Sequence, residues 1–344
     1  MPCITFTSLG LVVLDEVHFP ERTALYNILG GSGTYATLGA RLFLPPPISH
    51  SLGWMLHVGH DFPRSAEELL ESWSTTLMIA RQADQKSTRG LLEYKDTTFG
   101  PKDFKYTTPI LAVQEDNLEQ MDLLGSKVYH YLASPEDIKV RISSLLRLRE
   151  AASISERPLI IWEPAPLSCK PENFQAFLDA LASVDVFSPN HLELAALCSE
   201  PSIVSFDEGK IEKLVLTFLS HGVGPGGNGT VIVRAGEFGC MVSTRVLSPR
   251  WLPPVHASGP ETERNVKVVD PTGAGNAFLG AYGVGYLETQ NPVLAACYGA
   301  VGASFAVEQV GMPGLSRDGD REMWNGINVR SRLQEYMHYV GSAT

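Results

Sequence analysis

A glycine-rich turn between two apolar segments is the strongest chemical signal in the sequence. Val268 and Val269 lead into residues 270–276, which read D-P-T-G-A-G-N, and small and apolar residues follow. This order predicts a β-run, a tight turn and then a helix. Backbone N–H groups are bare at such a helix start and the helix dipole is positive there, so the turn suits a phosphate. Glycines at this spacing also allow close helix packing, and spacing alone leaves both roles open.

Two further patterns contain residues that could contact a ligand. Gly30, Gly31 and Gly33 stand close together before a helix-like segment, where they form either a tight turn or a stretch of bare backbone that a ligand can approach. Asn190 is the last residue of a Ser-Pro-Asn helix start signal, and Glu193 lies one helical turn after it, so the two share a face. In isolation such a pair more often caps a helix than holds a ligand.

Other catalytic chemistries have weaker support. The chain has five cysteines, which are scattered and form no C-x-x-C pair: Cys3, Cys169, Cys198, Cys240 and Cys297. This usage disfavours a disulfide framework and a thiolate zinc site, and we expect buried free thiols. His57 and His60 have no third metal ligand at a suitable spacing. The G-x-S-x-G pattern is absent, so spacing singles out no Ser-His-Asp arrangement.

The elements that must position these residues alternate along the chain. Apolar, β-rich runs predict strands at residues 4–14, 127–132, 159–162, 184–187 and 230–233. Helix signals lie between them, at residues 35–43, 135–148 and 190–198. This alternation predicts a mostly parallel sheet with crossover helices, and a ligand site beyond the carboxyl ends of the strands.

Two irregular segments interrupt this alternation. Residues 18–27 and the polar, partly basic residues 81–106 are expected to form a small antiparallel flap, whose aromatic side chains would pack on a substrate or on a second copy of the chain. Residues 221–230 hold five glycines and a proline, which predicts a surface loop leading into a strand. Near the end, a helical spacing of apolar side chains predicts an amphipathic helix: Val329, Leu333, Tyr336 and Val340.

Composition limits the class of protein. The net charge is −11, which disfavours a general nucleic-acid-binding protein, since such proteins neutralise phosphate with Lys and Arg. Apolar residues make up 44% of the chain and charged residues 19%, which is typical of a globular protein. No apolar run approaches the ~20 residues that a membrane-spanning helix needs. The first basic residue is Arg22, so the start lacks the charged region of a secretory signal, and we expect a cytoplasmic protein without a membrane partner.

Several motifs together resemble those of one enzyme family. The turn at residues 270–276 is similar to the D-T-x-G-A-G-D signature of the PfkB/ribokinase family of carbohydrate and nucleoside kinases. Further landmarks of that family occur in the expected order: L-G-G-S-G-T-Y-A at 29–36, V-G-H-D-F at 58–62, N-H-L-E at 190–193 and G-M-P at 311–313. The resemblance spans roughly residues 4–315, and its specificity comes from the agreement of four ordered motifs rather than from any single one.

The resemblance implies a substrate pocket and a transfer site. The pocket for a sugar or nucleoside would be lined by Asp15, Gly30, Gly31 and Gly33, with the carboxylate at Asp15 receiving substrate hydroxyls. The migrating phosphoryl group would be held by Gly273, Ala274 and Gly275, and Asn276 would face the acceptor hydroxyl.

The resemblance also implies the cofactors ATP and Mg²⁺. Contacts to the nucleotide would come from Asn190, Glu193, Gly236 and Gly239. Metal ions would lie near Glu193, Asp270 and Thr272, with a monovalent cation such as K⁺ near the last two.

The sequence departs from the family pattern at Asn276. Active members have an aspartate at this position, which takes the proton from the attacking hydroxyl, whereas an amide has no basic form at neutral pH. A general base typically contributes ~10²–10⁴-fold, so the resemblance leaves efficient transfer in doubt. Pro271 also replaces the usual threonine. The sequences at 88–91, 162–166 and 187–191 resemble those of the fungal maintenance-of-killer branch of PfkB-like proteins, in which a glycine-asparagine turn also occurs.

These observations lead to one expected fold and to three candidate functions. We expect a single ribokinase-like domain over residues 1–344, a three-layer α/β sandwich with a mostly parallel central sheet and a small β lid formed by about 15–28 and 81–112. The favoured function is ATP-dependent phosphoryl transfer to a hydroxyl of a small sugar-like or nucleoside-like metabolite. The alternatives are a pseudokinase scaffold that binds a nucleotide or metabolite, and a different enzyme that reuses the same pocket. A homodimer formed through the lid is also expected.

Overall fold

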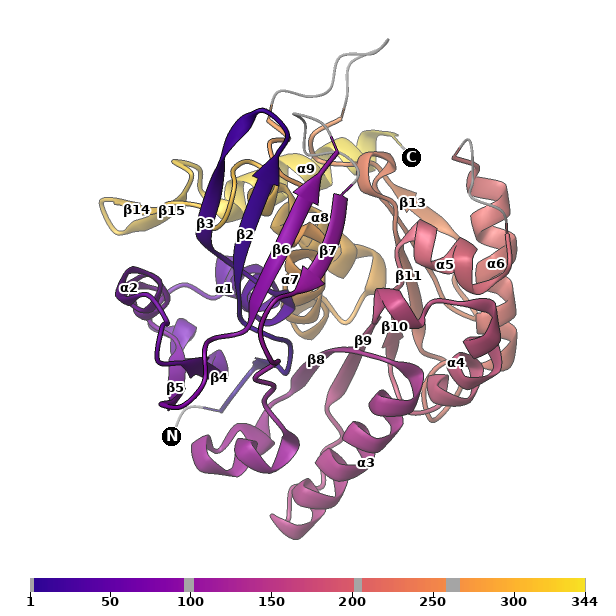
Figure 1. Cartoon of the computed structure of the whole chain (residues 1–344). Helices are drawn as coiled ribbons and strands as arrows, with labels where there is room; N and C mark the ends of the chain where they lie inside the picture. The colour runs from indigo at the N-terminus through magenta and orange to yellow at the C-terminus, as the bar shows by residue number, and fades with distance from the viewer. Residues whose placement is uncertain (1–2, 96–101, 201–205, 258–266, 344) are drawn as a thin grey trace.

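The chain is built around a seven-stranded sheet (Figure 1). The structure is a computed structural model that describes residues 3–95, 102–200, 206–257 and 267–343. The strand order is β1-β8-β9-β10-β11-β12-β13, and neighbours pair in parallel as far as β11. The last two strands are antiparallel. Their bounds are β1 Phe6–Ser8, β8 Val128–Ala133, β9 Leu159–Pro164, β10 Val186–Phe187, β11 Thr230–Arg234, β12 Cys240–Ser243 and β13 Arg250–Leu252.

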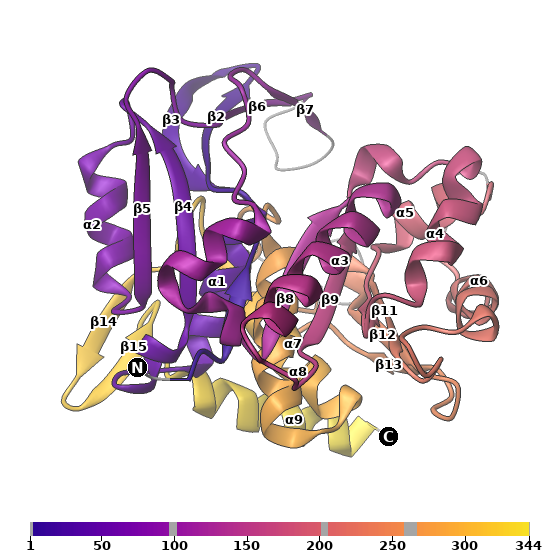
Figure 2. The ribbon, with the colours of Figure 1, turned by 90° about the horizontal axis from the view of Figure 1, so that it is seen from below.

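Helices cover both faces of this sheet, because alternate strand residues point in opposite directions. Phe6, Val128 and Ile161 face one apolar cluster, which contains residues of α1 Ser32–Phe43, α7 Ala274–Thr289, α8 Pro292–Ala306 and α9 Val329–Ala343. Tyr129 and Trp162 face the other, which contains residues of α3 Pro135–Ala151, α4 Phe174–Leu181, α5 His191–Leu197 and α6 Glu208–His221. Figure 2 shows α7, α8 and α9 on one side and α3 to α6 on the other. The three-layer arrangement is therefore confirmed.

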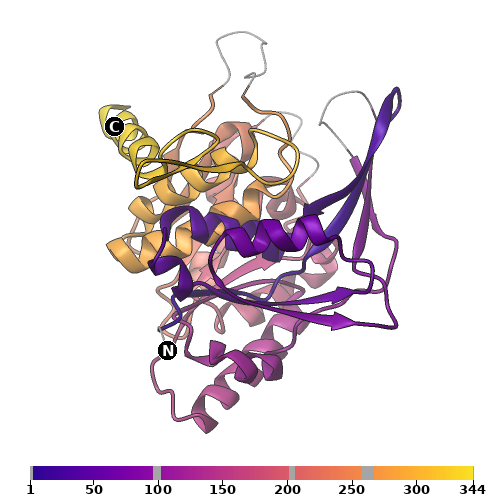
Figure 3. The same ribbon diagram turned by 90° about the vertical axis from the view of Figure 1, so that its left-hand side faces the viewer.

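A second, four-stranded sheet projects from this core (Figure 3). We call it the lid sheet, with the order β3-β2-β6-β7 and the bounds β2 Val13–Phe19, β3 Arg22–Gly30, β6 Arg89–Tyr94 and β7 Lys102–Tyr106. Its middle pair, β2 and β6, is parallel, so the expectation of an antiparallel flap was wrong for that pair. The reason is topological: the two hairpins β2–β3 and β6–β7 meet side by side with their first strands running the same way. Residues 96–101 of the expected lid lie outside the described residues.

The remaining elements lie at the border of the core. A parallel pair, β4 Gly53–Gly59 and β5 Thr76–Gln82, is connected by α2 Arg64–Ser72. A hairpin, β14 Leu315–Asp318 and β15 Arg321–Trp324, precedes α9. Short 3₁₀ turns include residues 48–51, 115–121, 123–125, 166–168, 171–173 and 236–238.

Two strand predictions were wrong. Residues 4–14 do not form one run: β1 lies in the central sheet and β2 begins the lid sheet. The chain leaves the central sheet at Gly10, which lies so close to Gly33 that a Cβ at position 10 would be 2.5 Å from the backbone nitrogen of Gly33. Val268 and Val269 do not form a strand either. The backbone N–H groups of Val269 and Asp270 both donate to the carbonyl of Val307, at the end of α8, instead of to a neighbouring strand.

The other element predictions agree with the structure. The expected helix at 35–43 is the main part of α1, 135–148 lies within α3, and 190–198 contains α5. Val329, Leu333 and Tyr336 are buried along α9, as expected for an amphipathic helix. Of the cysteines, all of which are free thiols, Cys169, Cys240 and Cys297 are buried, Cys198 is partly buried and Cys3 is exposed, so the expectation of burial was wrong for Cys3.

Candidate active site

Two helices, α1 and α7, pack against each other through glycines. Gly39 and Gly280 make this possible, because a Cβ at either position would lie within 2 Å of a carbonyl oxygen of the other helix. Each helix has a glycine with positive φ as its N-cap: Gly31 with φ 95° for α1 and Gly273 with φ 77° for α7. The aromatic ring of Tyr35 on α1 lies directly over Gly273. The starts of the two helices are thereby fixed relative to each other.

The turn before α7 is closed by two hydrogen bonds within it, one to a side chain and one to a backbone carbonyl. The backbone N–H of Thr272 donates to Asp270 Oδ1 at 2.9 Å, and Ala274 N–H donates to the carbonyl of Pro271 at 3.3 Å. Asp270 is buried. The turn therefore presents its backbone at the positive end of α7, the arrangement that stabilises a negative charge.

Asp15 lies on β2, in the lid sheet, and is only 6% exposed. It pairs in register with Gly90 of β6, and its two carboxylate oxygens fill the spaces beside two glycines. A Cβ would lie 2.1 Å from Oδ2 at Gly30 and 2.4 Å from Oδ1 at Gly90. The structure thus brings Asp15 together with the first glycine of the expected pocket.

The other two glycines of that motif have a packing role. A Cβ on Gly31 would lie 2.4 Å from the carbonyl oxygen of Leu11, and a Cβ on Gly33 would lie 2.4 Å from that of Gly10. The N–H of Gly33 also donates to the Leu11 carbonyl at 2.9 Å. These glycines allow the segment between β1 and β2 to pass close to the start of α1.

Three phenols lie near Asp15 or the α7 turn. Burial, followed by the nearby Asp270 and Asp15 carboxylates, raises the pKa of Tyr35 far above its usual value. Burial, followed by Asp15, raises the pKa of Tyr106. Burial also raises the pKa of Tyr94, together with both carboxylates, although a contact of its hydroxyl with Thr272 Oγ1 at 3.4 Å partly opposes this. The phenols therefore stay protonated, and Tyr94 connects the lid sheet to the α7 turn.

A buried polar network also reaches the α7 start, where it contacts Asn276. Glu163, at the carboxyl end of β9, accepts hydrogen bonds from Arg234 Nη1 at 2.7 Å and from Asn276 Nδ2. His130 of β8 contacts Glu163 through Nε2 at 3.3 Å and the hydroxyl of Ser8 on β1 through Nδ1 at 3.0 Å. Burial raises the pKa of Glu163, but Arg234 and then His130 outweigh it, so the pKa lies below its usual value. Glu163 is therefore ionised at neutral pH.

The Ser8–His130–Glu163 order resembles a nucleophile, a base and an orienting carboxylate. However, Ser8 Oγ accepts a hydrogen bond from Gly10 N–H at 3.2 Å, and all three side chains are buried. Ser8 lines neither the cavity between residues 45–47 and the β14–β15 hairpin nor the one beside the end of α3. We therefore interpret this chain of contacts as a network that positions Asn276 and Arg234.

The pair Asn190 and Glu193 forms a capping box at the start of α5. Asn190 Oδ1 accepts from the N–H of Leu192 at 2.9 Å and of Glu193 at 2.8 Å, and Glu193 Oε2 accepts from Asn190 N–H at 2.8 Å. Burial raises the pKa of Glu193 to about 7, although Arg234, with Nη2 at 3.5 Å, opposes this. These side chains stabilise their own helix, as the alternative interpretation of the sequence proposed.

The residues expected to bind nucleotide and metal are only partly brought together. Gly236 begins a short 3₁₀ turn after β11, and Gly239 follows that turn. Both glycines have positive φ, and Gly239 packs on the carbonyl of Leu252. Among the described residues no group of three or more His, Cys, Asp or Glu side chains could hold a metal ion. Asp270 and Thr272 are bonded to each other, whereas Glu193 caps α5 and contacts Arg234.

Sequence patterns alone did not point to Ser8, His130 and Arg234, and they included Glu163 only within a longer motif. A signal was present for Glu163 and Arg234, because each directly follows an expected β-run, where parallel strands carry functional side chains. Ser8 and His130 lie within their expected runs and had no such signal. Which of these ends lie next to each other depends on strand order, and spacing does not reveal it.

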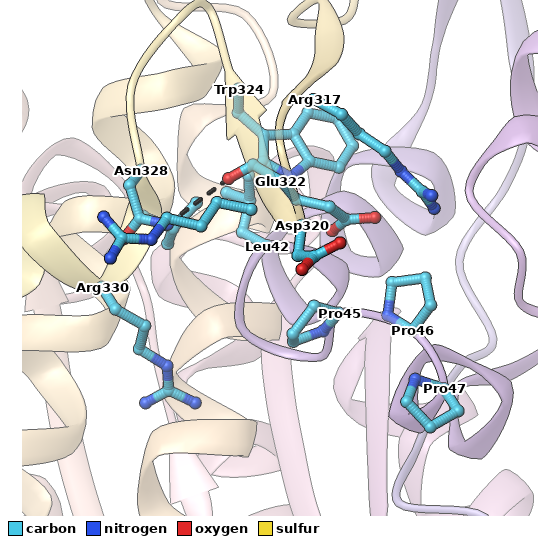
Figure 4. A pocket seen from close by; sticks show the side chains of 12 residues that line it. Leu42, Pro45, Pro46, Pro47, Arg317, Asp320, Glu322, Trp324, Asn328 and Arg330 are labelled. Carbon is cyan, nitrogen blue, oxygen red and sulfur yellow. Dashed lines mark hydrogen bonds between the residues drawn. The ribbon is translucent and has the colours of Figure 1, made fainter.

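One cavity lies away from this site (Figure 4). It has a volume of about 470 Å³ and lies between the prolines at residues 45–47 and the β14–β15 hairpin. Its lining includes Trp324, Glu322 and Arg330. Glu322 forms an ion pair with the buried Arg41, at 2.6 Å. None of the residues of the α7 start contributes to it.

Comparison with known proteins agrees with this geometry. The pattern of the pfkB family of carbohydrate kinases matches residues 9–315. The chain belongs to this family. As a PfkB protein it has relatives in fungi: an uncharacterized protein of Schizosaccharomyces pombe is 31% identical, over 98% of this chain and 94% of that protein. Protein MAK32 of Saccharomyces cerevisiae is 28% identical, over 96% of this chain and 92% of that protein, in line with the resemblance to the maintenance-of-killer branch.

Solved structures of this PfkB fold include ribokinase from Giardia lamblia. It superposes with a TM-score of 0.68 at 15% identity, over 98% of this chain and 99% of that enzyme. This likeness confirms the expected ribokinase-like fold. Among the described residues of this PfkB chain, no helix combines the length and apolar character needed to cross a bilayer.

Proposed function

We propose that this PfkB protein is an ATP-dependent phosphotransferase that acts on a hydroxyl of a small polyhydroxylated metabolite. One observation carries the proposal: Tyr35 packs over Gly273 at the α7 start and shares its surroundings with both Asp15 and Asp270. A hydroxyl acceptor and an anion-binding helix start therefore face the same small space.

The Asp15 side of this space suits a neutral ligand rich in hydroxyl groups. An ionised carboxylate accepts hydrogen bonds only, so it recognises the O–H groups of a sugar or nucleoside. The Tyr94 and Tyr106 phenols, whose pKa values are raised, stay protonated and can donate to ligand oxygens, whereas the Tyr35 hydroxyl already donates to the carbonyl of Gly311 at 3.5 Å. An anionic acceptor would meet two carboxylates here, Asp15 and Asp270, and would be disfavoured.

The α7 start suits the phosphates of ATP. Mg²⁺ retains several water ligands and binds to phosphates together with one or two carboxylates, so it needs no cluster of protein ligands. We expect it to reach the site bound to the nucleotide, near Glu193, and we expect a monovalent cation such as K⁺ near Asp270 and Thr272. The nucleotide would extend toward Gly236 and Gly239.

In the proposed reaction the acceptor oxygen forms a bond to the γ-phosphorus, and the bond from phosphorus to the bridging oxygen breaks. ADP leaves with that electron pair, and the hydroxyl proton passes to solvent. Phosphoryl transfer has a loose transition state, in which positioning and electrostatics supply most of the acceleration. Asn276 donates to Glu163, so its Oδ1 remains available to accept from the hydroxyl and to orient it.

A second candidate function is ligand binding without turnover. The observation that favours it is the same Asn276, whose amide replaces a base and is held by the ionised Glu163. In this case the protein would bind ATP or a metabolite and transfer no phosphoryl group.

Two measurements distinguish these candidates. The first is the melting temperature with and without millimolar ATP and Mg²⁺, which rises if the folded state binds nucleotide. The second is single-turnover transfer of labelled γ-phosphate to a panel of pentoses, hexoses, ketoses and nucleosides. Transfer supports the phosphotransferase, and a thermal shift without transfer to any acceptor supports the binding protein. Absence of both would reject the two candidates and favour a different enzyme that reuses the pocket.

A further inference from the structure

We infer that Arg234 contacts the transferring phosphate, as a cation that this chain adds to the α7 start. The inference rests on the proposed function, because it assigns a residue to the phosphate side of that site. None of the sequence motifs described above includes Arg234.

The first observation is where the guanidinium lies. Gly275 is the second residue of α7, and a Cβ on it would be 2.0 Å from Arg234 Nη1. The guanidinium therefore lies against the bare backbone of the first turn of the helix. Phosphate groups bind at this same place in a helix, because the free N–H groups and the dipole act together there.

The second observation is how Arg234 is held. Glu163 anchors Nη1 at 2.7 Å, and the carbonyl of Ser188 accepts from Nη2 at 2.9 Å. Glu193 lies at 3.5 Å from the same nitrogen, a longer contact. His130 in turn contacts the Glu163 carboxylate. The side chain, which is 12% exposed, is thus held by residues at the ends of β9 and β10 and by α5, and its Nη1 also lies against Gly275.

The third observation is the unused capacity of Arg234. A guanidinium has five N–H donors. Nε is buried and has no hydrogen-bond partner among the described residues, and Nη1 has a second hydrogen beyond the one given to Glu163. A buried donor without a partner destabilises the folded protein, and a phosphate oxygen at the α7 start would satisfy it.

Electrostatics point the same way. A cation near a helix N-terminus is unfavourable, because the dipole is positive there. The ionised Glu163 pairs with Arg234 and also accepts from Asn276 in the first turn of α7, so a single carboxylate serves both the guanidinium and the positive helix start. The Arg234 guanidinium and the N-terminus of α7 are both positive and lie next to each other, so an anion that binds between them is favoured. Arginine suits phosphate especially well, since its planar donors bind two oxygens at once.

The alternative is a purely structural ion pair, in which Arg234 only neutralises Glu163. The two roles differ in one measurable respect. A structural pair can be replaced by two neutral side chains without loss of anion affinity, whereas a phosphate contact cannot.

The test measures binding of inorganic tripolyphosphate and of ATP with Mg²⁺ to the full chain by isothermal titration calorimetry. The variants are Arg234→Lys, Arg234→Gln and the double variant Arg234→Gln/Glu163→Gln, which leaves no unpaired buried charge if the single variant does not fold. Arg250→Gln, on β13, is the matched control for loss of one exposed arginine. Circular dichroism checks the fold of each.

We expect Arg234→Gln and the double variant to lower the affinity for both ligands at least tenfold. Arg234→Lys should lower the affinity by a smaller factor, and Arg250→Gln should leave it unchanged. Equal affinity of the wild type and the double variant would overturn the inference, and so would absence of tripolyphosphate binding to the wild type. If the wild type binds tripolyphosphate through Arg234 but transfers no phosphate to any acceptor, the proposed function fails and the inference stands. If transfer occurs with the same KM for ATP in the double variant, the function stands and the inference fails.

Discussion

The two halves of the candidate site are built in different ways. On the side proposed to hold phosphate, Ser8, Glu163 and Arg234 lie at or next to the ends of central strands, and His130 lies within β8. In the order Ser8, His130, Glu163, Arg234, each is bonded to the next. On the acceptor side, Asp15 belongs to the lid sheet, which projects from the core (Figure 3). Under the proposed function the first half would combine ligand binding with the stability of the core. The second would contribute mainly to ligand binding, so its loss should abolish function at little cost in stability.

The largest effect is expected for Glu163→Gln. This substitution leaves Arg234 as an uncompensated buried cation, and breaking a buried pair in this way typically costs ~3–5 kcal/mol of unfolding free energy. The matched control is Glu93→Gln in the lid sheet, whose exposed partner Lys105 lies at 3.3 Å, for which we expect less than about 1 kcal/mol. Urea unfolding at pH 7 measures both.

The pH dependence gives a second measure of Glu163. Its pKa is lowered in the folded protein, so its contribution to stability is present above the unfolded pKa and is lost as the pH falls through the folded value. The unfolding free energies of the wild type and of Glu163→Gln should therefore converge in acid. A difference that stays constant as the pH falls until the wild type itself unfolds would show that the ionised form of Glu163 is not what stabilises the network.

The opposite pattern is expected for Asp15→Asn. The amide keeps the shape of the side chain but loses the charge that receives ligand hydroxyls, and two charge-assisted hydrogen bonds of ~1.5–3 kcal/mol each predict at least a ~100-fold loss of affinity for the acceptor. The unfolding free energy should change by less than about 1 kcal/mol. Calorimetry with the acceptor found in the panel, together with urea unfolding, tests this. If the variant binds the acceptor as tightly as the wild type does, the acceptor pocket does not include Asp15.

Much of the fold and one half of the site could be predicted from the sequence. The α7 turn and the order of strands and helices follow from local signals, namely glycines, prolines and apolar runs, which act over a few residues. Asp15 and Gly30 could be linked through the resemblance to PfkB kinases, and the structure places them in contact.

The other half depends on strand order. His130 and Glu163 are 33 residues apart, and Glu163 and Asn276 are 113 residues apart, and they meet because β8 and β9 are neighbours and α7 begins beside them. No local pattern specifies such a contact. For the same reason the segment at residues 4–14 was predicted as one strand, although its two halves pair with different sheets.

A smaller effect on stability is expected from the ion pair between Asp61 and Arg89, which connects the lid sheet to the core. Asp61, in the loop after β4, accepts from Arg89 of β6 through Nη2 at 2.8 Å and from the N–H of Ser87 at 2.6 Å. Burial raises the pKa of Asp61, but Ser87 and Arg89 outweigh this and lower it to about 2. Relative to its ordinary value of 3.8, this shift corresponds to roughly 2 kcal/mol of stability that is complete above pH ~4 and lost as the pH falls toward ~2.

Asp61→Asn should remove this acid-sensitive part of the stability. It should also increase the rate of hydrogen exchange in β6, since the lid sheet loses its ion pair to the core. Unfolding between pH 2 and 5, with exchange measured at pH 7, tests both expectations. If the acid profile of Asp61→Asn coincides with that of the wild type, the lid sheet is held by other contacts.

The smallest effect concerns the missing base at Asn276. Asn276→Asp alone would place two carboxylates in contact, because Asn276 Nδ2 already donates to Glu163. Like charges at this distance raise one pKa, so the pair would share a proton and the new carboxylate would be a poor base. The double variant Asn276→Asp/Glu163→Gln reverses the hydrogen bond instead, since the amide introduced at position 163 would donate to the carboxylate introduced at position 276. It also keeps one negative charge near Arg234.

We expect the double variant to transfer phosphate about tenfold faster than the wild type, and Asn276→Asp alone to gain less. The gain falls below the ~10²–10⁴-fold of a typical general base because Glu163→Gln also removes the anchor of Arg234. Single-turnover transfer across the acceptor panel measures this, with nucleotide affinity determined in parallel. If the double variant binds ATP as well as the wild type does and still transfers no faster, the missing base does not limit the reaction. Binding without turnover would then be the better description of this PfkB chain.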